Sequence, residues 1–459
     1  MLKSTLWWSL PLVLATAQVQ AIGVGEILPL IADGTHANAP GCAVAAFRAG
    51  QPILSTSAGL ADLKTGRAID GSTLFYAASV SKQFTALAVA QLAVAGDIDL
   101  DGDVRTYIPE LPEYTRTVTP RMLLHHTAGI ADWLSLAAMS GAKDWGALDR
   151  AQALALVIAR ADTAFEPGTR FEYSNGGYLL LAEIVARTSG QSFAEYLRTH
   201  VFEPMGMRDA FFLDGARPDD AHVAHGYLPD GDGFVVRDTY PLIGGSGGLM
   251  LSADDLARYE YDIEIGHAVW TDAVRDIMLA PAHLRDGSAA GMPSGLGYAG
   301  GLRVGERNGQ HVVEHGGAAE AFKLQYLRVP ARRLAVAVLC NRGDWNPNPR
   351  ADAIAALLEG DALWTGPAPM PERAGDYVDA GLDLHYRVGA VEGDRLPVRI
   401  VSPLTGEAGA VQWFKRGAQG VFVAEDPLRP VQIQFEPDAA ALQLSIAGAN
   451  TLRLLRSSD

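Results

Sequence analysis

The sequence has few cysteines and an excess of acidic side chains. Cys42 and Cys340 are the only cysteines among 459 residues, which excludes a fold built on a dense disulfide framework. There are 53 acidic and 37 basic side chains, and the formal net charge is -16. A surface of this sign repels nucleic acid and anionic lipid, so we expect neither as a partner. The sequence also lacks an internal repeat, which excludes a solenoid.

The N-terminal segment is apolar but too short for a comfortable membrane span. Lys3 precedes an apolar run from Leu6 to Leu14, and small residues follow as far as Ala21. This order is typical of a secretory signal peptide. We therefore predict that residues 1–21 are a signal peptide and that the protein is periplasmic or secreted, with no stable membrane insertion after cleavage. An uncleaved N-terminal anchor is the alternative, and it leaves the rest of the chain in an exported compartment.

Strand and helix patterns divide the remaining chain into two domains. Residues 22–360 have strand-like runs near both ends and a largely helical middle. The runs cover residues 42–48, 52–59, 301–304, 311–314, 322–329 and 334–340, and a helix is predicted over 351–358. Ala49-Gly50-Gln51 between the first two runs predicts a hairpin. The prolines of residues 364–371 indicate a linker over 361–374. Short alternating strands beyond it suggest an antiparallel barrel or sandwich, and we assign 375–459 to a C-terminal antiparallel β-barrel.

The two cysteines lie in strand-like runs far apart in the chain. Cys42 begins the first run, and Cys340 ends the last run of the first domain. If the two strands pair in antiparallel fashion, the side chains meet and a disulfide can form. Two separate buried thiols are equally well supported by the sequence.

Ser79 and Lys82 form the most informative pattern of the chain. Two residues three apart on a helix project from one face, one turn apart. A desolvated lysine can then remove the proton that keeps a serine hydroxyl a weak nucleophile. Apolar residues at helical spacing follow Ser79 as far as Gly96, which indicates a buried helix. A second copy of the pattern, Ser140 to Lys143, has no such apolar face and is interpreted as a loop.

Two further motifs follow in the chain. Tyr173-Ser174-Asn175 opens a predicted helix, and His315-Gly316-Gly317-Ala318 ends a strand-like run. With Ser-x-x-Lys, this order resembles the serine β-lactamase and penicillin-binding protein superfamily, nearest to class C β-lactamases and family S12 hydrolases. The stretches around Leu124–Gly129, Glu166–Thr169 and Gly247–Leu249 also resemble that family, over about residues 25 to 360.

The resemblance implies an α+β fold of the β-lactamase/DD-peptidase type. We expect an antiparallel five-stranded sheet with helices and an all-helical subdomain, followed by the small β-barrel. In the family the serine attacks a carbonyl to give an acyl-enzyme. Carried over, Ser79 is the nucleophile, Tyr173 is the general base beside Lys82, and Asn175 orients Lys82 or binds the acyl side chain. No metal or cofactor is implied.

The third motif is expected to bind the substrate along a strand. By resemblance, the backbone N–H groups of Ser79 and Ala318 hold the oxyanion, with Gly316 and Gly317 in the same substrate-binding strand. His315 stands where penicillin-binding proteins and most β-lactamases have lysine, although peptidases and esterases of the family often have histidine here. A histidine is shorter and mostly neutral at pH 7, so it anchors a substrate carboxylate less well. Lys323 or Arg328 could supply the missing charge, but both are expected to be solvent-facing strand residues.

These motifs predict an exported serine hydrolase that works through an acyl-enzyme on Ser79. The substrate is a small molecule or a peptide: a peptide or amide with D-configured residues, as for a DD-peptidase or an aminopeptidase, or a carboxylic ester. A class C-type β-lactamase is the alternative. A non-catalytic module that binds penicillin or peptide is a further alternative, because a fold alone never proves activity. The oligomeric state and the role of the C-terminal domain stay open.

Other motifs have less specific meanings. Gly244 to Gly248 matches the Gly-x-Ser-x-Gly elbow of α/β-hydrolases, with Asp254 and His315 following in the right order. An elbow needs a buried strand before the serine and a helix directly after it, and neither is predicted here. His222 and His225 lack a third ligand at a matching spacing, so a metal site is not predicted. His125 and His126 are expected to cap or pack a helix end.

Overall fold

The computed structural model describes two parts of the chain. The first comprises residues 24–32, 38–142, 144, 147–216, 218, 221–231, 233–292, 295–307 and 309–359, and the second comprises 375–379, 384–389, 395–401, 408–416, 421–424, 431–435, 441–446 and 449–457. The predicted signal peptide (1–21), the predicted linker (361–374) and Lys143 lie outside the described residues.

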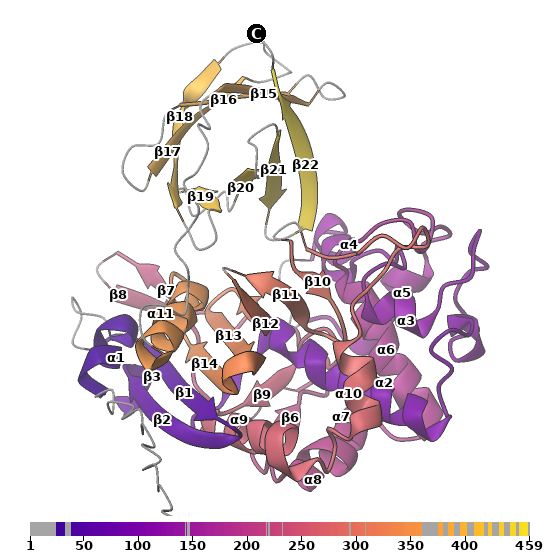
Figure 1. Ribbon diagram of the computed structural model, residues 1–459, viewed down its shortest axis with the longest axis horizontal. Helices are drawn as coiled ribbons and strands as arrows, with labels where there is room; N and C mark the ends of the chain where they lie inside the picture. Colours follow the sequence, from indigo (N-terminus) through magenta and orange to yellow (C-terminus); the bar gives the residue numbers. More distant parts are fainter. Residues whose placement is uncertain are drawn as a thin grey trace, which may run out of the picture.

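The first part contains one large antiparallel sheet of seven strands (Figure 1). In spatial order these are β10 (Gly297–Tyr298), β11 (Arg303–Arg307), β12 (Gln310–Ala319), β13 (Phe322–Val329), β14 (Leu334–Cys340), β1 (Cys42–Arg48) and β2 (Gln51–Ala58). The predicted α+β fold class is confirmed, with seven strands instead of the expected five. The edge strand β10 has only two residues, too few for an alternation that a sequence pattern can reveal.

The hairpin between β1 and β2 forms where the sequence predicts it. Ala49 and Gly50 have φ angles of 51° and 75°, a pair of positive values typical of a tight two-residue hairpin turn. At the other end of the sheet β12 is longer than predicted and extends to Ala319. The third motif therefore lies inside a strand and not after one. Glycine has low strand propensity, which is why Gly316 and Gly317 suggested an earlier end.

Helices cover both faces of the sheet (Figure 1). One face packs against α1 (Val24–Ile31) and α11 (Pro347–Glu359), which share a buried cluster with Val44, Val336 and Val338. The other face packs against the helical region, through residues that include Ala43, Phe47 and Ala337. Because neighbouring strand residues point to opposite faces, the two sets alternate along β1 and β14.

The helical region consists of short helices around two long ones. It comprises η1 (Ala78–Val80), α2 (Ser81–Ala95), η2 (Val104–Thr106), α3 (Pro120–Leu124), α4 (Trp133–Met139), α5 (Arg150–Ile158), α6 (Asn175–Ser189), α7 (Phe193–Leu197), α8 (Glu203–Met205), α9 (Ala253–Tyr261) and α10 (Asp272–Leu279), with π-helical turns at Arg198–Phe202 and Asp262–Gly266. Most side chains of α2 are buried, and the helix ends at Gly96 in the left-handed conformation, the usual role of a glycine after a helix.

Three small sheets complete this part. They pair β3 (Leu60–Asp62) with β4 (Arg67–Ala68), β9 (Leu249–Leu251) with both β5 (Phe75–Tyr76) and β6 (Phe211–Phe212), and β7 (Tyr227–Asp230) with β8 (Gly233–Val236). After β5, the Ala77 N–H donates to the Leu249 carbonyl at 2.8 Å. The chain is thus fixed to β9 directly before η1.

Cys42 and Cys340 form a disulfide between two central strands of the sheet. The two residues are directly paired across β1 and β14, and their Cα atoms are 4.1 Å apart. Of the two alternatives that the sequence supports, the disulfide is confirmed and the pair of separate thiols is wrong. The bond closes a loop across 298 positions of the chain, so it restricts the unfolded state strongly.

The second part of the chain is a closed barrel of eight antiparallel strands (Figure 1). They are β15 (Gly375–Asp379), β16 (Leu384–Val388), β17 (Arg395–Val401), β18 (Ala408–Arg416), β19 (Phe422–Ala424), β20 (Val431–Phe435), β21 (Ala441–Ile446) and β22 (Ala449–Arg456). Strand β22 pairs back with β15, which closes the barrel and removes its edges. Aliphatic and aromatic side chains, among them Leu396, Tyr377 and Phe414, form the barrel's core.

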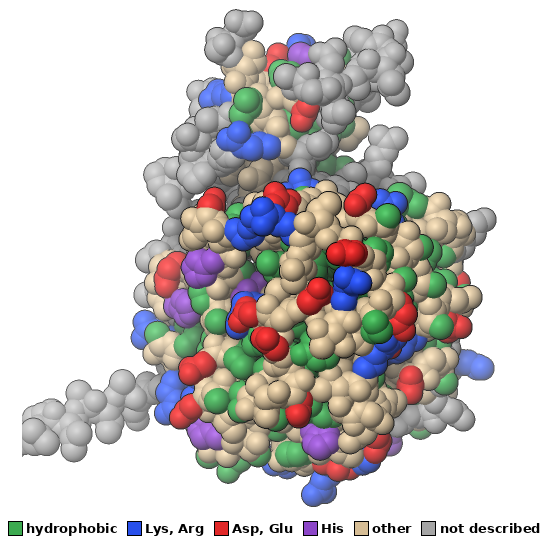
Figure 2. Space-filling model, turned by 90° about the vertical axis from the view of Figure 1, so that its right-hand side faces the viewer, with side chains coloured by type: hydrophobic (Ala, Val, Ile, Leu, Met, Phe, Trp, Pro, Cys, Tyr) green, Lys and Arg blue, Asp and Glu red, His purple; other side chains and the backbone are tan. Residues whose placement is uncertain are grey.

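The surface carries charges of both signs. Figure 2 shows acidic and basic side chains interspersed over the face that it presents. In the described ranges, no helix combines the length and the apolar character that a membrane crossing requires.

Candidate active site

Ser79 lies at the junction between η1 and α2, and Lys82 lies in the first turn of α2. The Lys82 Nζ is 3.2 Å from the Ser79 Oγ, as expected for residues one turn apart. Ser79 is partly exposed, whereas Lys82 is fully buried. The pair therefore offers an accessible hydroxyl with a water-excluded amine behind it.

The Lys82 amine is held by three acceptors. Besides Ser79, the Asn175 Oδ1 accepts from Nζ at 2.8 Å and the Ser246 carbonyl accepts at 2.7 Å. Burial lowers the pKa of Lys82 to about 7, against a smaller raising effect of Asp132. At neutral pH a large fraction of this lysine is therefore unprotonated and able to accept a proton.

Tyr173 lies over the Lys82 amine. The Lys82 Nζ is 4.7 Å from the centroid of the Tyr173 ring. Burial raises the pKa of Tyr173 well above its ordinary value, while the neighbouring Ser79 hydroxyl and the charge of Arg303 lower it. The Tyr173 hydroxyl makes no hydrogen bond of normal geometry with a described residue. In this environment Lys82 is the stronger candidate for the base, and Tyr173 is a neutral proton donor. The sequence-based assignment of Tyr173 as the base stays a prediction.

The His126 ring packs against the Tyr173 ring. Its ring centroid is 4.3 Å from the Tyr173 ring and 4.5 Å from the Tyr298 ring. The His126 Nδ1 accepts a hydrogen bond from the Ser174 N–H at 3.1 Å. Burial lowers the pKa of His126 far below its ordinary value, so the ring is neutral. His126 therefore has the expected packing role, and the residues that it packs against belong to the loop of Tyr173 and Ser174.

Asn175 connects Lys82 to a carboxylate that the sequence did not single out. Its Nδ2 donates to the Asp132 Oδ2 at 2.8 Å, and its backbone N–H donates to the same oxygen at 2.7 Å. Of the two roles expected for Asn175, the geometry matches the orientation of Lys82. The signal for Asp132 in the sequence was only that of a helix N-cap, since it precedes α4.

Strand β12 presents a free edge beside Ser79. Its pairing with β11 ends at Glu314, whereas its pairing with β13 continues to Ala319. Within the described chain, residues 315–319 of β12 have no strand partner on the side away from β13. At Gly317 an added Cβ would lie 2.3 Å from the Ala77 carbonyl oxygen, so β12 packs directly on the backbone before Ser79.

His315 is buried and neutral. Its Nδ1 is 2.7 Å from the Gly316 carbonyl and its Nε2 is 2.9 Å from the Tyr298 hydroxyl. Because a carbonyl only accepts, the proton lies on Nδ1, and Nε2 accepts from Tyr298. Burial lowers the pKa of His315 far below its ordinary value. The side chain is thus a hydrogen-bond partner of Tyr298, and a neutral ring offers no positive charge to a substrate carboxylate. That it anchors a carboxylate less well than lysine stays a prediction.

Besides Lys82, Arg303 is a second cation whose charge acts on this site. It lowers the pKa of Lys82, His126, Tyr173 and His315. No described residue forms a hydrogen bond with its buried Nε, and no described carboxylate lies within ion-pair distance. Arg303 was not predicted from the sequence, because nothing in the strand pattern around it distinguishes it from a surface arginine.

The two residues weighed earlier as sources of charge lie in other environments. Arg328 is buried and paired with Glu260 and Glu264, at 3.2 Å from Glu260, so the solvent-facing interpretation is wrong for it. A buried arginine needs such partners. Lys323 is partly buried, which lowers its pKa, and Glu320 is its electrostatic neighbour.

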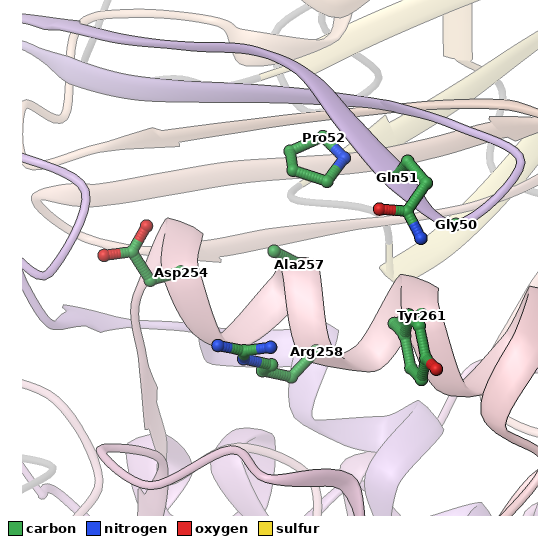
Figure 3. Close-up of a pocket in the computed structure, with 7 residues that line it drawn as sticks. All are labelled: Gly50, Gln51, Pro52, Asp254, Ala257, Arg258 and Tyr261. Carbon is green, nitrogen blue, oxygen red and sulfur yellow. The ribbon is translucent and has the colours of Figure 1, made fainter.

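The hydrolase-elbow interpretation is contradicted by the structure. Ser246 lies in a loop before β9, and its Oγ accepts from the Trp133 Nε1 at 3.2 Å. Asp254 lines a separate surface pocket of about 290 Å³ between the β1–β2 hairpin and α9, together with Gly50, Gln51, Pro52, Ala257, Arg258 and Tyr261 (Figure 3). Ser246 contributes its carbonyl to Lys82 instead, a contact that no sequence pattern indicated.

The remaining histidines and the second Ser-x-x-Lys copy are outside the site. His225 lies 2.8 Å from Asp238, and among the described residues no cluster of three or more His, Cys, Asp or Glu is arranged to hold a metal. His125 is the C-cap of α3. Ser140 is exposed at the end of α4.

The Ser79–Lys82 arrangement is typical of the nucleophile and base of a serine hydrolase. The chain belongs to the Beta-lactamase family, whose model matches residues 29–361. The resemblance inferred from the motifs is thereby confirmed.

Relatives and solved structures agree with this membership. A D-aminopeptidase of Brucella anthropi is 30% identical over 370 residues, which cover 78% of this chain and 65% of that protein. This chain thus spans about two thirds of its length. The octameric penicillin-binding protein homologue from Pyrococcus abyssi is similar with a TM-score of 0.64 and 22% identity, over 94% of this chain and 98% of that one. The D-amino acid amidase from Ochrobactrum anthropi SV3 has a TM-score of 0.62 and 20% identity, over 74% and 99%. These two likenesses concern the fold alone.

Proposed function

We propose that this chain is an exported serine hydrolase that cleaves peptides or amides with D-configured residues through an acyl-enzyme on Ser79. The observation that carries the proposal is the buried Lys82 amine, with a pKa near neutrality, 3.2 Å from the Ser79 hydroxyl. We also propose that residues 22–360 form the hydrolase domain, joined by the linker 361–374 to an accessory domain of residues 375–459.

Acylation begins with a proton transfer from Ser79 to Lys82. The Ser79 Oγ forms a bond to the substrate carbonyl carbon while its proton moves to the neutral Nζ. The resulting oxyanion is held by the backbone N–H groups of Ser79 and Ala318. When the carbon–nitrogen bond breaks, the leaving amine takes the Tyr173 hydroxyl proton, and Lys82 returns a proton to Tyr173. The same groups activate water and release the acid in the second half of the cycle.

Three observations support a peptide or amide substrate. The relatives of about 30% identity are D-aminopeptidases. The unpaired edge of β12 at residues 315–319 offers backbone groups that an extended chain can pair with. Arg303, whose buried Nε lacks a hydrogen-bond partner among the described residues, suits a carboxylate on the substrate.

Two observations support export. The N-terminal segment has the order of a signal peptide, although it lies outside the described residues. The Cys42–Cys340 disulfide is typical of proteins in an oxidising compartment.

A substrate panel tests the proposed activity. The purified protein, and a Ser79→Ala variant as the control, are offered matched D- and L-aminoacyl amides, peptides ending in D-residues, an acetyl ester and a chromogenic cephalosporin. We expect turnover of D-amides or D-peptides that the variant lacks, because only the wild type forms the acyl-enzyme. Preference for the cephalosporin would favour the β-lactamase alternative, and binding without turnover of any substrate would favour the non-catalytic module.

Removal of the Arg303 charge should separate charged from neutral substrates. In Arg303→Gln we expect kcat/KM for a peptide with a free carboxylate to fall about 10-fold or more, the size of a lost charge-assisted hydrogen bond. The corresponding peptide amide should change less than about 3-fold, because it carries no charge for Arg303 to bind. An equal loss for both peptides would contradict the proposed anchor. The control is Arg170→Gln, because Arg170 is an exposed arginine. Arg307→Gln would not serve as a control, since Arg307 forms ion pairs with Glu314 and Asp352.

A further inference from the structure

Asp132 lies where the active site meets the start of α4. Its Oδ1 accepts from the backbone N–H of Ser135 at 2.8 Å and from the Ser135 hydroxyl at 3.0 Å, which caps the helix. Its Oδ2 accepts both N–H groups of Asn175, at 2.7 and 2.8 Å. One carboxylate therefore uses one oxygen for the helix and the other for the active site.

These contacts determine which way the Asn175 amide points. An amide presents an oxygen on one side and an NH₂ group on the other. Because the Nδ2 is bound to an oxygen that can only accept, the Oδ1 must point to the opposite side, where the Lys82 Nζ donates to it at 2.8 Å. With the amide reversed, an NH₂ group would face the lysine amine and repel its protonated form.

Asp132 also supplies negative charge to the site. Its charge raises the pKa of Lys82 and also the pKa of Tyr173. No other carboxylate contributes to both shifts among the described residues. The other groups that face Lys82 are cationic or neutral: Arg303, His126, His315, Tyr173 and Tyr178. At Lys82 the carboxylate thus opposes both burial and Arg303, whereas at Tyr173 it adds to the effect of burial and opposes only Arg303.

We propose that Asp132 is a positioning residue, which fixes the Asn175 amide and thereby holds Lys82 on Ser79 in a state that can both gain and lose a proton. The inference rests on the proposed function, in which Lys82 is the base. It adds a residue that touches neither the substrate nor Ser79 and that acts through Asn175.

The test is Asp132→Asn. An asparagine caps a helix as well as an aspartate, but it has a single acceptor oxygen, so the helix or Asn175 loses its partner. We expect kcat/KM for the best substrate to fall about 10²-fold through misplacement of Lys82. Loss of the negative charge lowers the pKa of Lys82 further, so the acid limb of the pH profile should move to lower pH by about 1 unit.

Asp149→Asn is the matched control. Asp149 caps α5 in the same way, accepting from the Gln152 N–H at 2.7 Å, and it has no contact with the site residues. It should leave both kcat/KM and the pH midpoint unchanged. If Asp132→Asn behaved like this control, the proposal would be wrong. A loss of activity matched by a loss of thermal stability, with an unmoved pH midpoint, would show a purely structural role and would also overturn it.

A titration that needs no substrate separates this inference from the proposed function. The sequence has only six lysines, so ¹³C NMR of labelled lysine side chains can follow Lys82, identified by its absence in Lys82→Met. We expect a midpoint near 7 in the wild type and a lower one in Asp132→Asn. A lower midpoint without hydrolysis of any substrate would support Asp132 and contradict the proposed function. An identical midpoint in both proteins would contradict the role of Asp132.

Discussion

Lys82→Met should abolish most of the activity. It should also make the free energy of unfolding depend less on pH. Without the amine, no other base among the described residues lies within hydrogen-bond distance of Ser79, and general-base catalysis contributes about 10² to 10⁴-fold to kcat. Methionine is apolar and of similar length, so the buried space of Lys82 stays filled. Measurement of kcat beside a thermal melt separates the catalytic loss from any loss of folding.

The stability effect has a definite sign. The folded pKa of Lys82 is about 7 and its ordinary value is 10.5, so between these values the unfolded chain binds a proton that the folded chain does not. Wild-type stability therefore rises with pH across this window relative to the variant, by about 2 kcal/mol between pH 7 and pH 9. Urea unfolding of both proteins at the two pH values measures this difference. No change in the difference would show that Lys82 titrates normally, and the exposed Lys64, changed to methionine, is the control.

Gly317→Ala should damage the oxyanion site through one added methyl group. Its Cβ would meet the Ala77 carbonyl oxygen at 2.3 Å, and this partner is backbone that β9 holds in place. Strand β12 must then move away from η1 and carry the Ala318 N–H with it. Loss of one oxyanion donor lowers kcat about 10² to 10³-fold, and the overpacking itself costs about 1–3 kcal/mol of stability.

Gly316→Ala is the control from the neighbouring position. There the added Cβ would meet the Gln325 Oε1 at 3.0 Å, the end of a side chain that can rotate away. We expect kcat within about 3-fold of the wild type and a loss of stability of about 1 kcal/mol, because the buried Gln325 side chain, whose Nε2 donates to Glu314 at 3.3 Å, must adjust while the backbone stays in place. Equal kcat values for the two variants would contradict the assignment of the oxyanion site to the contact between β12 and η1.

The sequence was sufficient for the fold class and for the residues that surround the nucleophile. Each of the three motifs is a short stretch of sequence that lies at a helix start or in a strand. Together they contain Ser79, Lys82, Tyr173, Asn175 and His315. Helix capping and apolar periodicity are short-range signals, which is why α2, α6 and the β1–β2 hairpin appeared where expected. The full length of β12 and the edge strand β10 were missed because glycine-rich and two-residue strands lack alternation.

The electrostatics of the site required the three-dimensional structure. Asp132 is 43 positions from Asn175 in the chain. Arg303 lies on β11, the strand next to β12, and its charge lowers the pKa of Lys82. Neither relation leaves a periodic pattern. The structure also assigns the lowered pKa to Lys82 and leaves Tyr173 protonated, since burial penalises a charged amine and a phenolate alike. The sequence alone gives no estimate of that burial.

The most direct test of the account is the site of covalent modification by an activated phosphonate, a reagent that mimics the tetrahedral intermediate of acyl transfer. Peptide mass spectrometry of the labelled protein should place the adduct on Ser79, and Lys82→Met should slow its formation. A label on Ser246, or a rate of labelling that is unchanged in Lys82→Met, would contradict the claim that Lys82 activates Ser79.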